Sequence, residues 1–211
     1  MTPDRETFHA ALVARHGEER QAKFDAARVA VCGLGGLGSN IAVALARAGV
    51  GHLHLVDFDK VEPSNLNRQQ YAASQVGLAK AEATKANIAA INPYCNVTAE
   101  TLRVTAGNVA ALFADDDIVC EAFDRAEEKA TLVSSVMAAF PEKPVVAASG
   151  MAGLKSANAI TTRRVSRRLY VCGDGVADVS DGLGLYGARV LVCAAHQATM
   201  VLRLIDGQQE P

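Results

Sequence analysis

The chain of 211 residues contains no tryptophan, and aromatic residues make up only 5% of it. Its core must therefore be mainly aliphatic. No apolar run reaches the roughly 18 residues that a membrane-spanning helix needs. The first residues, MTPDRETFHAALVARHG, include acids and have no apolar signal core. We therefore expect neither a secretory signal nor a membrane partner.

Neither sign of charge is in large excess. Lysine and arginine number 21 against 23 acids, so the formal net charge is −2. Such a chain has no global basic field to attract nucleic acid, which is disfavoured as a partner. With 50% hydrophobic and 21% charged residues, the composition is typical of a soluble globular protein. We expect an N-terminal helical segment over residues 1–27 and a single domain over residues 28–211.

Paired cysteines are missing as well. No C-x-x-C occurs, which excludes a zinc ribbon and a thioredoxin-type redox motif, and no zinc is expected. The number of cysteines is odd and most lie in apolar runs, which indicates reduced thiols and a cytoplasmic location. The cysteines are Cys32, Cys95, Cys120, Cys172 and Cys193.

The chain does contain a regular alternation of strand-like and helix-like segments. Short apolar runs predict strands over residues 28–32, 52–59, 96–100, 117–123 and 144–150. Helical patterns cover residues 40–50, 77–91, 108–113, 127–140 and 189–205, and one or two further strands precede a glycine-rich loop over 173–187. This alternation predicts an α/β fold, Rossmann-like and doubly wound, with a mostly parallel sheet and helices on both faces.

A glycine-rich loop follows the first predicted strand. Residues 33–38 read GLGGLG, a G-x-G-x-x-G between a strand and a helix. The glycines Gly33, Gly35, Gly36 and Gly38 permit a tight turn and let the backbone approach a phosphate. Asp57 ends the next predicted strand, where a carboxylate can accept hydrogen bonds from ribose hydroxyls. The pattern predicts an adenine-nucleotide site; the alternative is a turn that only packs a helix on the sheet.

The glycine loop alone does not identify the nucleotide, because NAD-dependent dehydrogenases have the same loop after their first strand. A P-loop is excluded, because the motif G-x-x-x-x-G-K-[ST] is absent. Arg68 and Lys80 fall at the same predicted sheet edge, where two cations suit a polyphosphate. Asp124 follows the fourth strand there, and a carboxylate beside a triphosphate requires a cation such as magnesium between them. The three together favour Mg-ATP. Taken singly, Lys80 reads as a solvated helix residue, Arg68 as half of a surface ion pair and Asp124 as a helix N-cap.

The same residues carry a resemblance to a known family. The segments GLGGLGSN, VDFDKVEPSNLNRQQY, the helix that contains Lys80 and INP resemble the ThiF/MoeB/HesA group, the bacterial relatives of ubiquitin-activating enzymes. The second half, with EAFDRAEEKATL, PVVAASGMAG and YVCGD, resembles the short ThiF-like subgroup associated with thiamine biosynthesis. The resemblance extends from about residue 28 to residue 205.

This resemblance implies a reaction, cofactors and a partner. Members of the group use ATP and Mg²⁺ to adenylate the C-terminal glycine carboxylate of a small ubiquitin-like carrier. Here the implied partner is a ThiS-like sulfur-carrier protein that ends in Gly-Gly, in thiamine thiazole biosynthesis. Such enzymes are usually dimeric, so we expect a homodimer.

The resemblance also implies roles for the matching residues. The glycines of residues 33–38 would lie along the nucleotide and Asp57 would hold the ribose. Asp124 would bind magnesium, with Asp59 nearby. The triphosphate would contact Asn65, Arg68 and Lys80, and Gln69 is included in the nucleotide site. Arg68, Lys80 and Asp124 are the expected catalytic residues.

Two departures from the group concern cysteine and arginine. Longer relatives have paired C-x-x-C zinc ligands, and some relatives have an N-terminal R-Y-x-R-Q segment; this chain has neither. Some members use a cysteine in the loop before the last helix. Cys172 is the candidate here, because a glycine-rich loop follows it and nearby arginines would lower the pKa of its thiol. Those arginines, Arg163, Arg164, Arg167 and Arg168, otherwise form a solvated strand face or a docking surface for an acidic carrier.

Three alternative functions remain open. A related enzyme would activate another carboxylate, on a MoaD-like carrier, a peptide or a tRNA base. An NAD-dependent dehydrogenase would use the same glycine loop, but this short chain lacks a second substrate domain. A non-catalytic partner of an activating enzyme would not need Arg68, Lys80 and Asp124 together.

Overall fold

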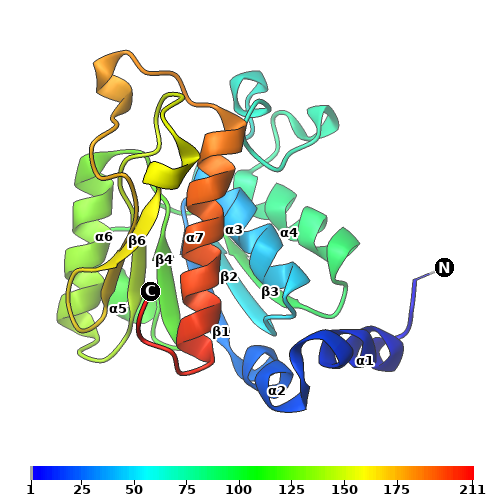
Figure 1. Ribbon diagram of the computed structural model, residues 1–211. Coiled ribbons are helices and arrows are strands. Elements are labelled where there is room, and N and C mark those ends of the chain that lie inside the picture. Colours follow the sequence, from blue (N-terminus) through cyan, green and yellow to red (C-terminus); the bar gives the residue numbers. More distant parts are fainter. Residues whose placement is uncertain (1) are drawn as a thin grey trace.

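The computed structural model describes residues 2–211, without the side chain of Val179 (Figure 1). A seven-stranded sheet has the strand order β3-β2-β1-β4-β5-β7-β6. Neighbouring strands are parallel except β6 and β7, which pair antiparallel at one edge. The strands are β1 (Arg28–Cys32), β2 (His52–Val56), β3 (Asn96–Glu100), β4 (Ile118–Glu121), β5 (Val145–Ala148), β6 (Thr161–Arg164) and β7 (Leu169–Gly173).

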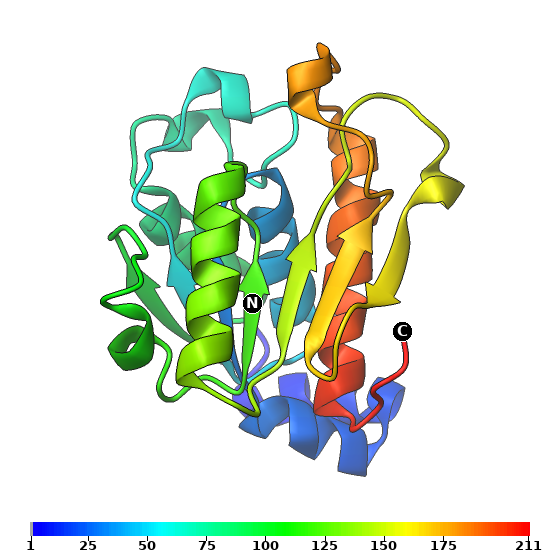
Figure 2. The same cartoon turned by 90° about the vertical axis from the view of Figure 1, so that its left-hand side faces the viewer.

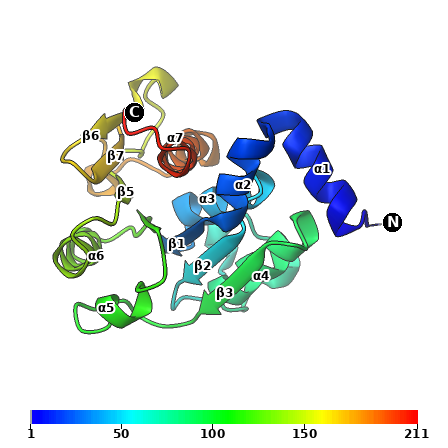
Figure 3. The same cartoon turned by 90° about the horizontal axis from the view of Figure 1, so that it is seen from below.

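Helices cover both faces of this sheet (Figure 3). One face carries α3 (Gly36–Arg47), α4 (Lys80–Ile91) and α7 (Gly187–Ile205), and the other carries α5 (Val109–Leu112) and α6 (Ala126–Ala139). The pair α1 (Arg5–His16) and α2 (Glu18–Ala26) lies at the amino ends of the strands, away from the arrowheads in Figure 2. Single 3-10 turns lie in the loops at Pro63–Asn65, Ala73–Gln75, Ala157–Ala159 and Val179–Asp181. The predicted doubly wound, Rossmann-like α/β fold is confirmed.

Two aliphatic clusters fill the space between the sheet and its helices. Alternation along β1 divides them: Val29 and Val31 pack toward α3 and α7, whereas Ala30 and Cys32 belong to the cluster under α5 and α6. Because successive side chains of a strand point to opposite faces, a strand covered on both sides must be apolar throughout. This explains why β1 reads as an unbroken apolar run.

The helix α7 is long and apolar enough, by length and composition, to cross a membrane. It packs along α3, however, and contributes Val190, Cys193 and Val201 to the core. The fully buried Gln197 of α7 donates from Nε2 to the carbonyl oxygens of Glu121 and Val146, at 3.0 and 3.2 Å. These contacts make α7 a core helix of the folded domain.

Several element boundaries differ from the prediction, among them the helix predicted over residues 40–50, which spans Gly36–Arg47. Two of the differences have a local cause. The second strand ends at Val56 and not at Asp59, because the Asp57 carboxylate accepts hydrogen bonds from the backbone of Leu34 and Asp59. The helix predicted from Gly77 begins at Lys80, because Gly77 has a φ of +91° that a right-handed helix cannot include.

The turn from β1 into α3 depends on two glycines. Gly33 has a φ of +86°, and a Cβ there would lie 2.8 Å from the carbonyl oxygen of Ala122. A Cβ on Gly38 would lie only 1.7 Å from the carbonyl oxygen of Gly33. Only glycine therefore lets the first turn of α3 approach the end of β1 so closely.

The Gly38→Ala variant tests this packing. The added methyl group cannot be placed without moving backbone, so we expect the free energy of unfolding to fall by at least the roughly 1–3 kcal/mol typical of overpacking. Gly107→Ala is the matched control, because the nearest atom to its added Cβ lies 3.9 Å away; it should change stability by no more than about 0.5 kcal/mol. Denaturant titration of both variants measures the difference, and equal stabilities would contradict the argument.

Candidate functional site

The site lies where the sheet reverses its direction of winding. From β1 the chain moves outward to β2 and β3 on one side, and β4 and β5 continue on the other. Ligands of open α/β sheets bind beside the carboxyl ends of the strands at such a point. The loops after β1 and β4 meet there, because Gly33 packs against Ala122 and Phe123.

Asp57 joins the glycine loop to the end of β2. Its carboxylate is 6% exposed, and its two oxygens accept hydrogen bonds from the backbone N–H groups of Leu34 at 2.6 Å and Asp59 at 2.7 Å. Burial raises the pKa of this carboxyl above 3.8, although the Leu34 hydrogen bond and the charge of Lys80 oppose the shift. The acid is thus fixed at the predicted position beside the glycine loop.

Lys80 starts α4 with its side chain turned into the protein. The residue is 8% exposed, and its Nζ lies 3.0 Å from Oδ2 of Asp59. The alternative interpretation of Lys80 as a solvated helix residue is therefore wrong. The structure places one buried ammonium group near two carboxylates, Asp57 and Asp59, at the carboxyl edge of β2.

The segment after Asp59 brings further polar groups to the glycine loop. Asn65 is buried, and its Oδ1 accepts from the N–H of Glu62 at 3.0 Å. Gln69 is 8% exposed, with its Nε2 3.8 Å from the place of a Cβ on Gly35. Its Oε1 is buried and has no hydrogen-bond partner among the described atoms. An unsatisfied buried oxygen beside a glycine loop can accept a hydrogen bond from a ligand.

Arg68 packs on the glycine loop without a carboxylate partner. Its Cγ lies 3.3 Å from the place of a Cβ on Gly36. Its Nη1 donates to neutral oxygens only, the Ser64 carbonyl at 3.1 Å and the Asn67 side chain at 2.9 Å. Among the described residues no ion pair involves Arg68, so the surface ion-pair interpretation is wrong. Its charge is free to attract an anion at this loop.

Asp124 follows β4 on the loop that contacts Gly33. Its side chain is exposed, and within residues 2–211 it makes no hydrogen bond or ion pair. The N-cap interpretation is wrong, because Arg125 occupies the N-cap of α6 and no side chain caps that helix. No group of three or more metal-ligand side chains occurs among the described residues. A single unpaired carboxylate fits magnesium that is held jointly by a protein and by phosphates.

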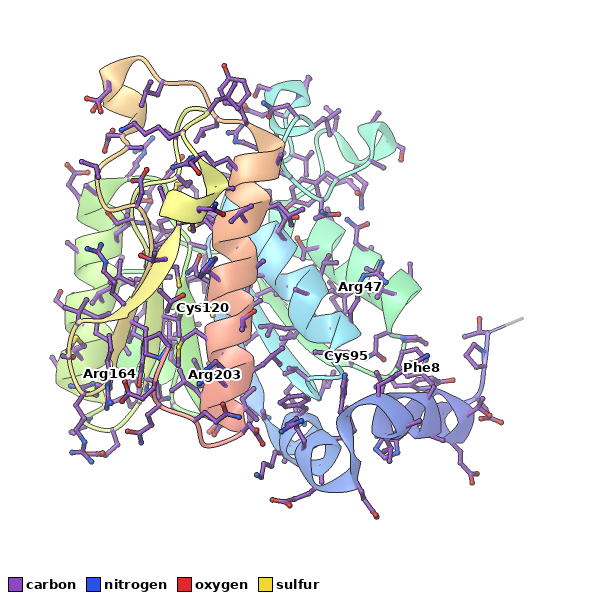
Figure 4. The ribbon with its side chains drawn as sticks, viewed as in Figure 1. Phe8, Arg47, Cys95, Cys120, Arg164 and Arg203 are labelled. Atoms are coloured by element: carbon purple, nitrogen blue, oxygen red, sulfur yellow. The ribbon has the colours of Figure 1, made fainter. Side chains whose placement is uncertain are left out.

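The structure corrects the interpretation of Cys172. Its side chain is fully buried in β7, and burial raises the pKa of the thiol to about 11. The nearby arginines do not lower it. Arg164 pairs with Glu210, and Arg168 donates to the backbone carbonyl of Met137. Figure 4 shows Arg164 near the end of the sheet opposite the glycine loop. A buried, protonated thiol is not a nucleophile, so Cys172 leaves the catalytic set.

Two buried ion pairs at this edge were not predicted from the sequence. Arg189 of α7 lies 2.7 Å from Asp174, and its Nη1 also donates to the carbonyls of Lys155 and Ser156. Glu121 at the end of β4 pairs with Lys129 of α6. The available signal was a charged residue inside an apolar run, as in the strand sequence IVCE.

The loop before α7 also reaches the site. Nδ2 of Asn67 donates to the carbonyl oxygen of Leu185 at 3.1 Å, and a Cβ on Gly187 would lie 2.6 Å from the carbonyl oxygen of Asn67. The start of α7 therefore rests on the segment that carries Arg68.

The fold and the site define a Rossmann-like α/β domain with a glycine loop of the nucleotide-binding type. Residues 9–211 match the ThiF family. The chain belongs to the ThiF family, and the resemblance drawn from its motifs is confirmed.

Two similar proteins illustrate the range of the family. The adenylyltransferase and sulfurtransferase UBA4 of Yarrowia lipolytica is 30% identical over 201 residues, which are 93% of this chain and 50% of the relative. The tRNA threonylcarbamoyladenosine dehydratase of Escherichia coli is 42% identical over 121 residues, 56% of this chain and 45% of the relative. A crystal structure of the E. coli dehydratase with ATP has a TM-score of 0.86 at 26% identity and covers 98% of both chains. This chain spans half or less of the curated relatives.

Thiol labelling tests the correction of Cys172. At neutral pH an alkylating reagent should leave Cys172 unmodified until the protein unfolds, because the thiol is buried and its pKa is raised. Burial raises the pKa of Cys95 to about 11 as well, but Cys95 is the one cysteine of the described chain that is only half-buried, so it should take up most of the slow native label. Mass spectrometry of the labelled wild type, Cys172→Ser and Cys95→Ser gives the sites. Fast native labelling that disappears in Cys172→Ser would restore this cysteine as a nucleophile.

Proposed function

We propose that this protein is an ATP-dependent adenylyltransferase, with residues 28–211 as its adenylation domain. The observation that carries the proposal is the charge distribution at the glycine loop: Arg68 packs on that loop with no carboxylate partner within the described chain, and Lys80 is buried nearby. Two cations beside a nucleotide loop suit a triphosphate better than a dinucleotide. Family membership, the names of the relatives and the ATP-bound structure of the E. coli dehydratase support it.

The residues divide the work as follows. Asp57 holds the ribose hydroxyls, while Arg68, Lys80, Asn65 and Gln69 bind the phosphates. A carboxylate oxygen of the substrate attacks the α-phosphorus, and the bond to the β-phosphate breaks as pyrophosphate leaves with the electron pair. The protein supplies no nucleophile; it aligns two anions and offsets the charge on the leaving group.

Asp124 is the residue that would hold magnesium. It offers an exposed, unpaired carboxylate at the edge where the phosphates would lie. When bound, the metal would neutralise charge on the leaving pyrophosphate.

The proposed substrate is the C-terminal glycine carboxylate of a ThiS-like sulfur carrier, in thiamine thiazole biosynthesis. The motifs of the second half of the chain support this choice. A tRNA-base carboxylate is the second candidate, because the E. coli tRNA dehydratase structure matches this chain over 98% of both lengths. The proposal includes a homodimer and a cytoplasmic location, supported by the family resemblance and by five free cysteines.

Magnesium-dependent ATP–pyrophosphate exchange tests the activity. We expect exchange with a Gly-Gly-ending ThiS-like carrier, no exchange in Asp124→Ala, and a loss of about 10²–10³-fold in rate for Lys80→Ala with a smaller effect on ATP affinity. Asp115→Ala is the matched control, since this exposed acid precedes the same strand at its opposite end. It should behave as wild type.

The outcomes separate the candidates. If exchange requires tRNA and does not depend on the carrier, the substrate is the tRNA-base carboxylate and not the sulfur carrier. ATP binding without exchange for either would call for another carboxylate. Binding of NAD in place of ATP would contradict the proposed activity altogether.

The pH dependence of adenosine binding tests Asp57. The ionised carboxylate accepts hydrogen bonds from the ribose hydroxyls more strongly than the protonated carboxyl group does, and burial raises its pKa above 3.8. The affinity for adenosine should therefore be highest at neutral pH and should fall as the pH drops through the raised pKa of Asp57. Adenosine is used because it has no phosphate to titrate. In Asp57→Asn the affinity should be low at all pH values; an unchanged pH profile in that variant would assign the effect to another group.

A further inference from the structure

The loop that carries Asp124 begins at a fully buried acid. Glu121 closes β4 with 0% of its surface exposed, on the face covered by α6. A buried carboxylate persists only when it is paired and hydrogen-bonded. The Nζ of Lys129, in the first turn of α6, lies 2.9 Å from each of its oxygens.

This ion pair also binds the peptide that leads into Asp124. The N–H of Phe123 donates to Oε1 of Glu121 at 2.7 Å, and the Phe123 carbonyl accepts from Nζ of Lys129 at 2.8 Å. Both backbone polar groups of the residue before Asp124 therefore end on one ion pair. Two hydrogen bonds of the Lys129 ammonium group go to this cluster, one to Oε1 of Glu121 and one to the Phe123 carbonyl, whereas Oε2 of Glu121 interacts with it through charge alone.

Two further contacts restrict the same loop. Nε2 of Gln197 donates to the carbonyl oxygen of Glu121, and Gly33 lies against Ala122 and Phe123. The Asp124 side chain makes no contact of its own with the described polar groups, so its position follows from the backbone before it. A buried ion pair often stabilises a fold no more than well-packed apolar residues of the same size would. The contribution of this ion pair is to fix the position of the Phe123 peptide.

We propose that Glu121 and Lys129 are positioning residues that fix the Asp124 carboxylate for the metal bound with the nucleotide. The inference rests on the proposed function, because it needs a magnesium–nucleotide complex at this edge. Neither residue touches the nucleotide; both act through the Phe123 peptide.

The experiment compares ATP dissociation constants with and without Mg²⁺ and takes their ratio as the magnesium enhancement. In Lys129→Gln the enhancement should fall by about 10–100-fold, the range typical of partners that orient metal ligands. The metal-free affinity should stay at the wild-type value. Lys129→Arg should restore part of the enhancement. Glu128→Gln is the matched control, because Glu128 is the neighbouring residue of α6 and pairs outward with Arg103.

A second variant covers the risk that an unpaired Glu121 prevents folding. Glu121→Gln combined with Lys129→Gln removes both charges and leaves no buried ion without a partner. Thermal unfolding shows whether each variant folds. A folded double variant with wild-type magnesium enhancement, or a Glu128→Gln that loses it equally, would overturn the inference while leaving the adenylyltransferase intact. A wild-type protein that binds no ATP would overturn the proposed function and the inference with it.

Discussion

The close approach of α3 to the end of β1 is the constraint on which the site depends. It brings the helix N-terminus, with its unpaired N–H groups, to the carboxyl edge of the sheet, and glycine at positions 33 and 38 is the condition for it. Asp57 then fixes the loop from the side through the N–H of Leu34. The remaining polar groups gather around this turn: Arg68 packs on it directly, and the β4 loop rests against Gly33.

The sequence allowed most of this arrangement to be predicted. Short apolar runs locate the strands because both faces of a parallel sheet are covered, and β3 matches its predicted range of residues 96–100. The glycine loop, the place of Asp57 and a helix that contains Lys80 follow from local chemistry, although that helix was predicted three residues too early. Boundaries were less accurate where side chains bind backbone, as Asp57 does after β2.

What could not be predicted depends on burial and on contacts between distant segments. Cys172 stands beside a glycine-rich loop and a run of arginines, yet its thiol is buried in the core, and Arg164, Arg167 and Arg168 have partners elsewhere. The pairing of Asp174 with Arg189, and of Glu121 with Lys129, joins residues of different elements. No spacing rule selects such partners among the 23 acids of the chain.

The packing of α7 against α3 has a consequence for synthesis of the chain. Gln197 donates hydrogen bonds to backbone carbonyls of β4 and β5, and Val190 packs against Gly36 of the glycine loop. The loop is made early on the ribosome, but the helix that completes its environment is made only after all seven strands of the sheet. A nascent chain that ends before α7 exposes an apolar sheet face and an unfinished nucleotide loop, which is the kind of surface that chaperones recognise.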